Sequence, residues 1–256
     1  AAWKTKFPAG RTAPTPAQAA DGADFVFCCV GNDDDVRSVT TGPQGAFAAM
    51  RDGTIFVDHT TTSAELAREL DAAAGALGVM FLDAPVSGGQ AGAENGVLTV
   101  MAGGKPDAFA KAQPLMASYA RMTRLIGPAG SGQLTKMVNQ IAIAGLVQAL
   151  SEAIHFAEQA GLDVASVIET ISKGAAQSWQ MENRWKTMHA RQFDFGFAVD
   201  WMRKDLGFCL EEAKRNGAYL PVTRIVDGYY AEIQAAGGRR YDTSSLITRL
   251  GPAKKA

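Results

Sequence analysis

The chain lacks the features that mark several large classes of protein. It has only three cysteines in 256 residues, too few for a disulfide framework, and no CxxC pair that would suggest a metal site. Lys and Arg total 25 against 26 Asp and Glu, so the cationic excess of a nucleic-acid-binding protein is missing. Its most apolar stretch, residues 141–147, is far shorter than the roughly 20 residues that cross a bilayer. We therefore expect a soluble globular protein whose partner is a small molecule, with neither nucleic acid nor a membrane as partner.

The two ends of the chain give weaker indications. Residues 1–18 carry proline and charge in place of the apolar core of an export signal, so we expect a cytoplasmic protein. The tail from residue 251 to 256 is expected to be a solvated end. Cys28 and Cys29 lie side by side in an apolar run and are expected to be small buried hydrophobes.

The first half of the chain alternates strand and helix patterns. Continuous apolar runs at residues 24–30, 54–58 and 79–83 predict parallel strands covered on both faces. Helical patterns at residues 33–50 and 63–77 separate them, the second with Ser63 as its N-cap. This strand-helix-strand series predicts an α/β domain.

After Asp83 the pattern changes, and from Gly132 onward it is helical. Glu94-Asn95-Gly96 predicts a hairpin turn before a strand at residues 97–101, and a further helix and strand are expected from Pro106 and near residues 124–126. We place a domain boundary near residue 131, which gives an α/β domain over residues 1–131 and an all-α domain over residues 132–256. The expected helices of the second domain cover residues 133–160, a segment from Asp163 to about Gly174, and residues 202–216, 221–236 and 244–250.

One absence bears directly on nucleotide binding. A doubly wound nucleotide-binding sheet normally begins with a strand, a glycine-rich turn and a helix. This chain contains no GxGxxG and opens with AAWKTKF, which has the pattern of the end of a helix. Either the fold does not bind a dinucleotide, or the chain lacks its first βαβ unit of roughly 30 to 40 residues.

Two segments carry residues suited to chemistry on a small acid. In DAPVSGG, residues 83–89, the Ser87 hydroxyl and the backbone N–H groups of Gly88 and Gly89 follow a strand end and can bind a carboxylate, although a plain turn is the alternative. In GSGQLTKMVNQ, residues 130–140, Lys136 and Asn139 share one face of a helix. The start of a helix and burial both disfavour an ammonium ion, so Lys136 is a candidate for proton exchange, with a solvent-exposed face as the alternative.

Other polar residues are less informative. Lys204 and Asp205, in MRKDLGF at residues 202–208, have the plain alternative of an exposed ion pair. The three histidines lack metal-ligand spacing, and His155, in the apolar segment AIHFA, is expected to be a core histidine with its polar atoms satisfied.

Together these segments resemble the β-hydroxyacid dehydrogenase family, which includes 3-hydroxyisobutyrate dehydrogenase and tartronate semialdehyde reductase. The matching segments, in order, are DAPVSGG at 83–89, ENGVLTVMAGG at 94–104, GSGQLTKMVNQ at 130–140 and KDLGF at 204–208. Several motifs in order are far more specific than one. The resemblance implies a Rossmann-type NAD(P)-binding domain over residues 1–131, without its first βαβ unit, and a helical substrate and oligomerisation domain over residues 132–256.

The same resemblance implies a role for individual residues. It makes Lys136 the general acid/base, and no metal takes part. Either NAD or NADP fits, because the residues that would select between them belong to the unit that is absent. The implied substrate-binding residues are Ser87, Gly88, Gly89 and Asn139, and the implied cofactor-binding residues are Val30, Gly31, Thr61 and Lys204.

The function that follows is the reversible, NAD(P)-dependent oxidation of a small 3-hydroxy acid to its semialdehyde or 3-oxo acid. The far end of the substrate is expected to meet Trp179, Asn183 and Phe197. Two alternatives stay open: an imine or oxo-acid reductase on the same scaffold, and a non-catalytic binding or scaffold module. The apolar residues 141–150 exceed what a peripheral helix needs, so we expect a homodimer or homotetramer.

Overall fold

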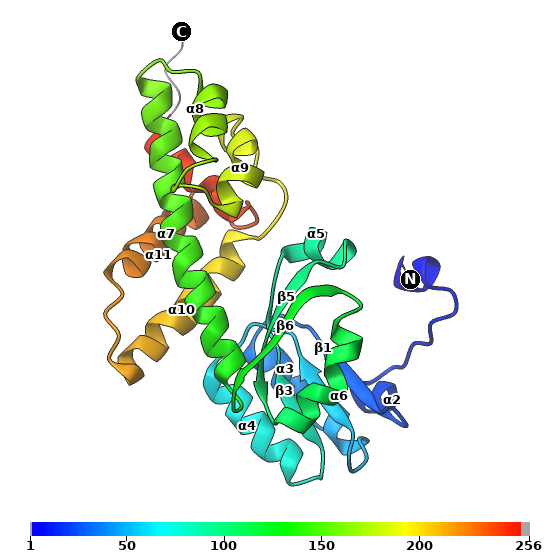
Figure 1. Cartoon of the computed structure of the whole chain (residues 1–256). Helices are drawn as coiled ribbons and strands as arrows, with labels where there is room; N and C mark the ends of the chain where they lie inside the picture. Colours follow the sequence, from blue (N-terminus) through cyan, green and yellow to red (C-terminus); the bar gives the residue numbers. More distant parts are fainter. Residues whose placement is uncertain (1, 252–256) are drawn as a thin grey trace. The chain divides into compact units, whose positions relative to one another are not determined.

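The computed structural model describes residues 2–251, which form two compact units. The first unit ends at Lys136 and the second begins at Met137. Helix α7 (Ser131–Gln159) begins in the first unit and continues into the second (Figure 1). The division therefore falls inside a helix and not in a linker. Most of the tail expected to be solvated, residues 252–256, lies outside the described residues.

The first unit is built on a mixed sheet whose strand order is β1-β2-β3-β5-β4, with β6 paired to β5. The parallel pairing of β1 with β2 and of β2 with β3 confirms the prediction for the three apolar runs. β5 runs antiparallel to β3 and β4 but parallel to β6. The strands are β1 (Phe25–Cys28), β2 (Ile55–Asp58), β3 (Met80–Asp83), β4 (Val86–Ser87), β5 (Leu98–Gly104) and β6 (Ala120–Gly127).

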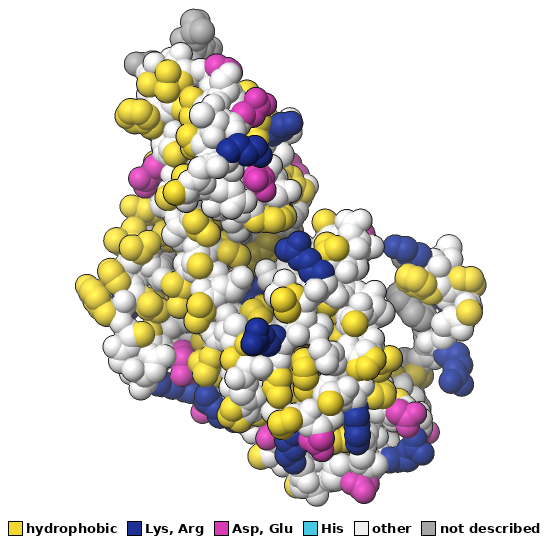
Figure 2. All heavy atoms as spheres, in the orientation of Figure 1, with side chains coloured by type: hydrophobic (Ala, Val, Ile, Leu, Met, Phe, Trp, Pro, Cys, Tyr) yellow, Lys and Arg dark blue, Asp and Glu magenta, His cyan; other side chains and the backbone are white. Residues whose placement is uncertain are grey.

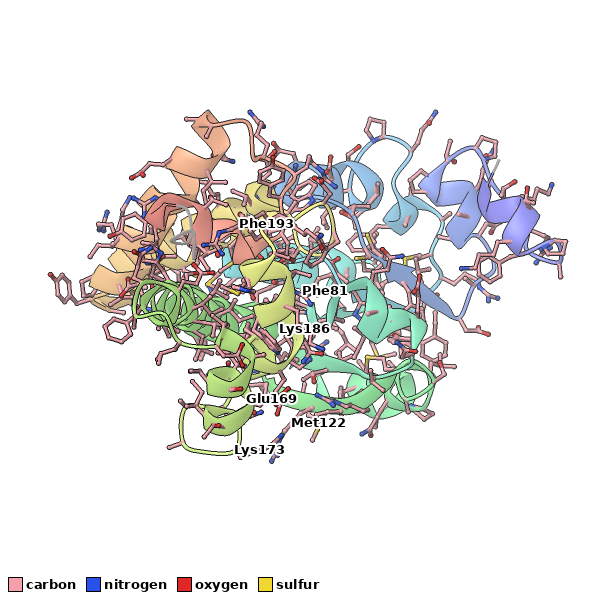
Figure 3. The ribbon with its side chains drawn as sticks, turned by 90° about the horizontal axis from the view of Figure 1, so that it is seen from above. Phe81, Met122, Glu169, Lys173, Lys186 and Phe193 are labelled. Carbon is pink, nitrogen blue, oxygen red and sulfur yellow. The ribbon has the colours of Figure 1, made fainter. Side chains whose placement is uncertain are left out.

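Helices cover both faces of this sheet, which explains why the strands are continuously apolar. Phe56 and Phe81 pack into a core cluster with residues of α4 (Ala64–Gly75), and Phe81 is labelled in Figure 3. Val57 and Leu82 belong to a second cluster with residues of α6 (Pro106–Met116). The remaining helices of this unit are α1 (Ala2–Lys6), α2 (Pro16–Ala20), α3 (Asp33–Thr40), the 3₁₀ helix η1 (Ala46–Ala48) and α5 (Gly89–Glu94).

Two predictions for this unit are wrong, because local sequence signals there favour a different backbone conformation. The helix expected over residues 33–50 ends at Thr40, because Gly42 precedes a proline, which disfavours helical backbone there. The turn at residues 94–96 is not a hairpin: Asn95 caps the C-terminus of α5, and Gly96 follows with φ 66°. An Asn-Gly pair serves a helix end as well as a primed turn.

Two expectations about burial are also wrong. Cys28 is buried as the last residue of β1, but Cys29 lies beyond the strand and is exposed. Nδ1 of His155 is buried without a hydrogen-bond partner, and the nearest carboxylate oxygen, Oε2 of Glu158, is 3.9 Å away. The local apolar pattern therefore did not reveal which polar atoms would find partners.

The second unit is helical, with two hydrophobic clusters on which α7 packs. Val147 of α7 contacts one cluster with Met202 and Tyr230, and Ile154 contacts the other with Phe193, which Figure 3 labels. The polar segment at residues 179–189 was not predicted as a helix, although the Ser178 side chain caps it by accepting from the N–H of Met181. The helices after α7 are α8 (Val164–Ile171), α9 (Trp179–His189), α10 (Val199–Asn216), α11 (Pro221–Ala235) and the 3₁₀ helix η2 (Thr243–Leu250).

Helix α7 is also long and apolar enough, by length and composition alone, to cross a membrane. Much of its apolar surface is used inside the protein, because Ala144, Leu150 and Ile154 are buried in the clusters of the second unit. Core helices of globular proteins share this composition, so the property is weak support for a membrane span.

Candidate active site

The candidate site of the first unit lies where the parallel strands end. β1, β2 and β3 run in the same direction and in register, so the loops that follow them emerge at one edge of the sheet. Ligands of open α/β sheets bind beyond this edge. These loops carry the expected cofactor residues Val30, Gly31 and Thr61 and lead into the expected substrate residues from Ser87 to Gly89.

A buried glutamine fixes the threonine loop after β2. The Gln133 side chain donates from Nε2 to the carbonyl of Thr60 (2.8 Å) and accepts at Oε1 from the N–H of Thr62 (3.0 Å). Thr60 and Thr62 are each 1% exposed, whereas Thr61 between them is half-buried. Thr61 is therefore the threonine of this run that stays accessible at the sheet edge.

The end of β1 is tied to the same loop. The N–H of Val30 donates to Oγ1 of Thr60 (3.0 Å), and Val30 itself is 37% exposed beside Gly31. The accessible Val30 side chain and the glycine beside it leave this edge of the sheet open to a ligand. The glycine-rich turn for the pyrophosphate does not occur in the 256-residue sequence, so the residues present can contact only the rest of a dinucleotide.

Asp83 connects the substrate loop to the helix that carries Lys136. Its side chain is fully buried and accepts from two N–H groups at the start of α7, those of Gly130 (Oδ1, 2.8 Å) and Gln133 (Oδ2, 2.9 Å). These N–H groups have no partner within the helix, and a carboxylate there also suits the helix dipole. Burial raises the pKa of Asp83 to about 6, although the same N–H bonds act to lower it.

Two glycines allow this close approach. A Cβ on Gly132 would lie 2.5 Å from the carbonyl oxygens of Asp83 and Met101, and one on Gly103 would lie 2.5 Å from Oδ1 of Asp83. The nearest atoms to a Cβ on Gly132 are backbone oxygens, which cannot move aside as the end of a flexible side chain can. The start of α7 is therefore packed directly against β3 and β5, and Lys136 follows one turn later.

The Ser87-Gly88-Gly89 loop has the backbone that carboxylate binding requires. Ser87 ends β4 opposite Thr99 of β5, which fixes its position in the sheet. Gly88 and Gly89 have φ of 132° and 61°, conformations that side chains disfavour. A Cβ on Gly89 would meet nothing within 4 Å, so a ligand can approach this backbone.

Lys136 lies in the second turn of α7 and is 7% exposed. The alternative of a lysine on a solvent-exposed face is therefore wrong. Asp83 holds the start of its helix and also begins the DAPVSGG segment, so one buried carboxylate sets the position of both. Among residues 2–251, no group of three or more His, Cys, Asp or Glu side chains is placed to hold a metal ion.

His59 is a site residue that the sequence did not reveal. Its Nδ1 lies 2.6 Å from the carbonyl of Ala84 and its Nε2 2.8 Å from the hydroxyl of Tyr119. A carbonyl can only accept, so Nδ1 carries the proton and Nε2 accepts from Tyr119. Burial lowers the pKa of His59, which favours this neutral form. The ring thereby holds Ala84, the second residue of the DAPVSGG segment, against the loop after β2.

Asp58 is a second buried carboxylate at this edge. It is 1% exposed, and burial raises its pKa to about 7, against the lowering effect of its bonds from Thr60. The pKa in the folded state is above the ordinary value, so the stabilisation from protonated Asp58 is complete below about pH 4 and is lost as the pH rises through 7.

Asp58→Asn is expected to remove this pH dependence. Between pH 5 and pH 8 the free energy of unfolding of the variant, relative to the wild type, should rise by about 2.5 kcal/mol, because the amide never ionises. Urea unfolding followed by circular dichroism at the two pH values measures the difference. Asp21→Asn, at an exposed position, is the control and should show no change. If the difference in free energy of unfolding between variant and wild type were the same at both pH values, the pKa of Asp58 would not be raised by folding.

The second unit holds the other expected site residues. Nδ2 of Asn139 donates to Oε1 of Gln140 (2.8 Å) on α7. Near the start of α10, Nζ of Lys204 lies 3.4 Å from Oδ1 of Asp205. Asp205 is 1% exposed, so the alternative of an ion pair on the surface is wrong.

The three residues expected at the far end of the substrate are all accessible. Trp179 and Phe197 are 47% and 38% exposed, and Asn183 is exposed while donating to the carbonyl of Trp179 (2.9 Å). The Arg184 guanidinium lies over the Trp179 ring at 4.7 Å. All three side chains are therefore accessible to a ligand, and their role at the far end of the substrate stays a prediction.

Comparison with known proteins identifies the family. The family model described as the NAD binding domain of 6-phosphogluconate dehydrogenase matches residues 2–127. The model described as NAD-binding of NADP-dependent 3-hydroxyisobutyrate dehydrogenase matches residues 130–250. The chain belongs to the β-hydroxyacid dehydrogenase family. It is accordingly an NAD(P)-dependent hydroxyacid dehydrogenase with a Rossmann-type domain followed by a helical domain.

Individual relatives of this dehydrogenase cover most of the chain. An uncharacterised oxidoreductase of Shewanella frigidimarina is 61% identical over 94% of this chain and 83% of its own length. The 2-hydroxy-3-oxopropionate reductase of Escherichia coli is 34% identical over 92% and 81%. A crystal structure of 3-hydroxyisobutyrate dehydrogenase from Salmonella typhimurium is 30% identical over 92% of this chain and 82% of its own, with a TM-score of 0.82.

Proposed function

We propose that this dehydrogenase interconverts a small 3-hydroxy acid and its semialdehyde or 3-oxo acid. The observation that carries the proposal is the Asp83 carboxylate, which joins the carboxylate-binding loop to the helix of the buried Lys136. The names of two relatives support the substrate class, because 2-hydroxy-3-oxopropionate and 3-hydroxyisobutyrate are short acids with oxygen on carbon 3.

Each site residue has one task in this proposal. Ser87 and the N–H groups of Gly88 and Gly89 bind the substrate carboxylate, and Asn139 orients the carbinol hydroxyl. Lys136, which is 7% exposed, takes the hydroxyl proton in oxidation and returns it in reduction. Fixing the carboxylate and the hydroxyl together supplies much of the rate through positioning.

The cofactor would lie against Val30, Gly31 and Thr61, with Lys204 on the cofactor side. When bound, NAD or NADP accepts hydride from the carbinol carbon or returns it, which no side chain does. Val30 and Thr61 are accessible at the end of the sheet, as this task requires.

A substrate panel tests the reaction class. The full-length protein is assayed with 3-hydroxyisobutyrate, glycerate and 4-hydroxybutyrate, each with NAD and with NADP. We expect reduced cofactor to form with at least one 3-hydroxy acid and not with 4-hydroxybutyrate, whose hydroxyl is one carbon further from the carboxylate. Silence across the panel, with cofactor still binding, would contradict the proposal and favour an imine substrate or a non-catalytic module.

We also propose that α7 pairs with α7 of a second copy, giving a homodimer or homotetramer. Val138 and Phe156 are 66% and 72% exposed, and 18 residues place them on the same side of the helix. Ala142 and Ala149, also exposed, lie between them at helical spacing. Figure 2 shows hydrophobic side chains gathered over α7 and α11. Small residues between two large apolar ones let two equivalent helices approach closely.

Light scattering with size-exclusion chromatography tests this assembly. The wild type should have the mass of two or four chains. Ala149→Arg should lower the measured mass, because it would bury a charge between the two α7 helices. Ala110→Arg, exposed on α6, is the matched control and should leave the mass unchanged. A monomeric wild type would contradict the proposal.

A further inference from the structure

We propose that Gln140 and Asp205 are positioning residues that set the amide orientation of Asn139 and the place of the Lys204 ammonium. This inference rests on the proposed function, because it concerns the two residues that the second unit contributes to that reaction. It assigns a task to two buried polar side chains that the reaction itself does not use.

The four side chains form one continuous chain of contacts. Asn139 donates from Nδ2 to Oε1 of Gln140 (2.8 Å), and Gln140 donates from Nε2 to Oδ2 of Asp205 (2.7 Å). The other carboxylate oxygen, Oδ1, lies 3.4 Å from Nζ of Lys204. Gln140 is 2% exposed and Asp205 1%, so water does not compete for these bonds.

The buried charge of Asp205 fixes which group donates and which accepts in each hydrogen bond of this network. A carboxylate paired with an ammonium only accepts, so Gln140 must present its NH₂ to Asp205. The carbonyl oxygen of Gln140 then faces Asn139, so Asn139 must donate to it from its own NH₂ group. Nδ2 of Asn139 thereby keeps its second hydrogen to donate to the oxygen of the substrate hydroxyl, whose own proton goes to Lys136. A neutral partner in place of Asp205 would not fix this order, because an amide can donate or accept.

The same carboxylate also places Lys204. Nζ lies 5.6 Å from the ring centroids of both Trp201 and Phe208, on the same helix. Two aromatic faces and one carboxylate together confine an ammonium that would otherwise swing on a long flexible stem. Asp205 thus acts on Lys204 directly and on Asn139 through Gln140.

A double-mutant cycle separates this role from a purely structural one. Asp205→Asn keeps the volume but removes the charge that directs the chain, and we expect kcat/KM for the hydroxy acid to fall about 10- to 100-fold. Asn139→Ala should then cost about tenfold less in the Asp205→Asn background than in the wild type, because Asn139 has already lost its orientation. Glu211→Gln, which breaks an exposed pair with Lys214 on the same helix, should change nothing.

Side-chain amide hydrogen exchange, followed by NMR, gives a second readout that does not depend on turnover. We expect the amides of Gln140 and Asn139 to be protected in the wild type and Asn139 to lose protection in Asp205→Asn. Independent kinetic effects of the two substitutions, or unchanged exchange at Asn139, would overturn the proposal. An enzyme silent on the substrate panel would overturn the proposed function alone, since the exchange measurement still decides the positioning role.

Discussion

Replacing Lys136 by alanine is expected to lower turnover of the 3-hydroxy acid by about 10²- to 10⁴-fold and to leave the fold intact. The lysine is the proton acceptor for the carbinol hydroxyl, and its burial leaves little room for water to take over that task. Lys136→Arg should be nearly as slow, because a guanidinium keeps its charge but does not release a proton near neutral pH. Initial rates of cofactor reduction at saturating substrate measure both effects.

Lys111→Ala is the matched control for this prediction. Lys111 is an exposed lysine on α6, so its removal should leave turnover within about twofold of wild type. A Lys136→Arg enzyme that kept near-normal turnover would show that the residue supplies charge and not a proton site. Near-normal turnover of Lys136→Ala would remove it from the reaction altogether.

Gly132→Ala is expected to lower the free energy of unfolding by about 2–3 kcal/mol. The added Cβ would lie 2.5 Å from two carbonyl oxygens, those of Asp83 and Met101, and neither can turn away without moving a strand. The start of α7 would shift away from Asp83, so turnover should fall together with stability. Urea unfolding and the substrate assay on the same preparation measure the two effects.

Gly228→Ala, in the interior of α11, provides the opposite result. A Cβ at Gly228 would meet nothing within 4 Å, and alanine in a helix interior is favoured over glycine by about 0.5–1 kcal/mol. This variant should therefore be slightly more stable than the wild type. Equal effects of the two substitutions would mean that the close packing around Asp83 does not limit stability.

The sequence predicted the inner strands β2 and β3 well because they are buried on both faces. Short, continuous apolar runs such as residues 54–58, separated by helical segments, are typical of buried strands. The alternation of strand and helix predicts their parallel pairing, which the structure has. Helix α9 was missed because its polar residues hide the helical period. The Asn95-Gly96 turn was assigned wrongly because the same pair ends a helix and makes a hairpin.

The candidate site was predictable only in the residues that would carry its chemistry. Ser87, Gly88, Gly89 and Lys136 stand in short segments whose residue types suggest their chemistry. The residues that hold these segments, Asp83, Gln133 and His59, make bonds across 25 to 73 positions of sequence. Such bonds depend on the register of whole strands and helices, which no local pattern contains.

The most direct test of the proposed reaction is the fate of deuterium that replaces both hydrogens on carbon 4 of the reduced cofactor during reduction of the semialdehyde by the full-length protein. We expect deuterium on the carbinol carbon of the 3-hydroxy acid, at a rate that falls about 10²- to 10⁴-fold in Lys136→Ala. A hydroxy acid without deuterium at that carbon, or no hydroxy acid from any semialdehyde offered while the cofactor binds, would contradict it.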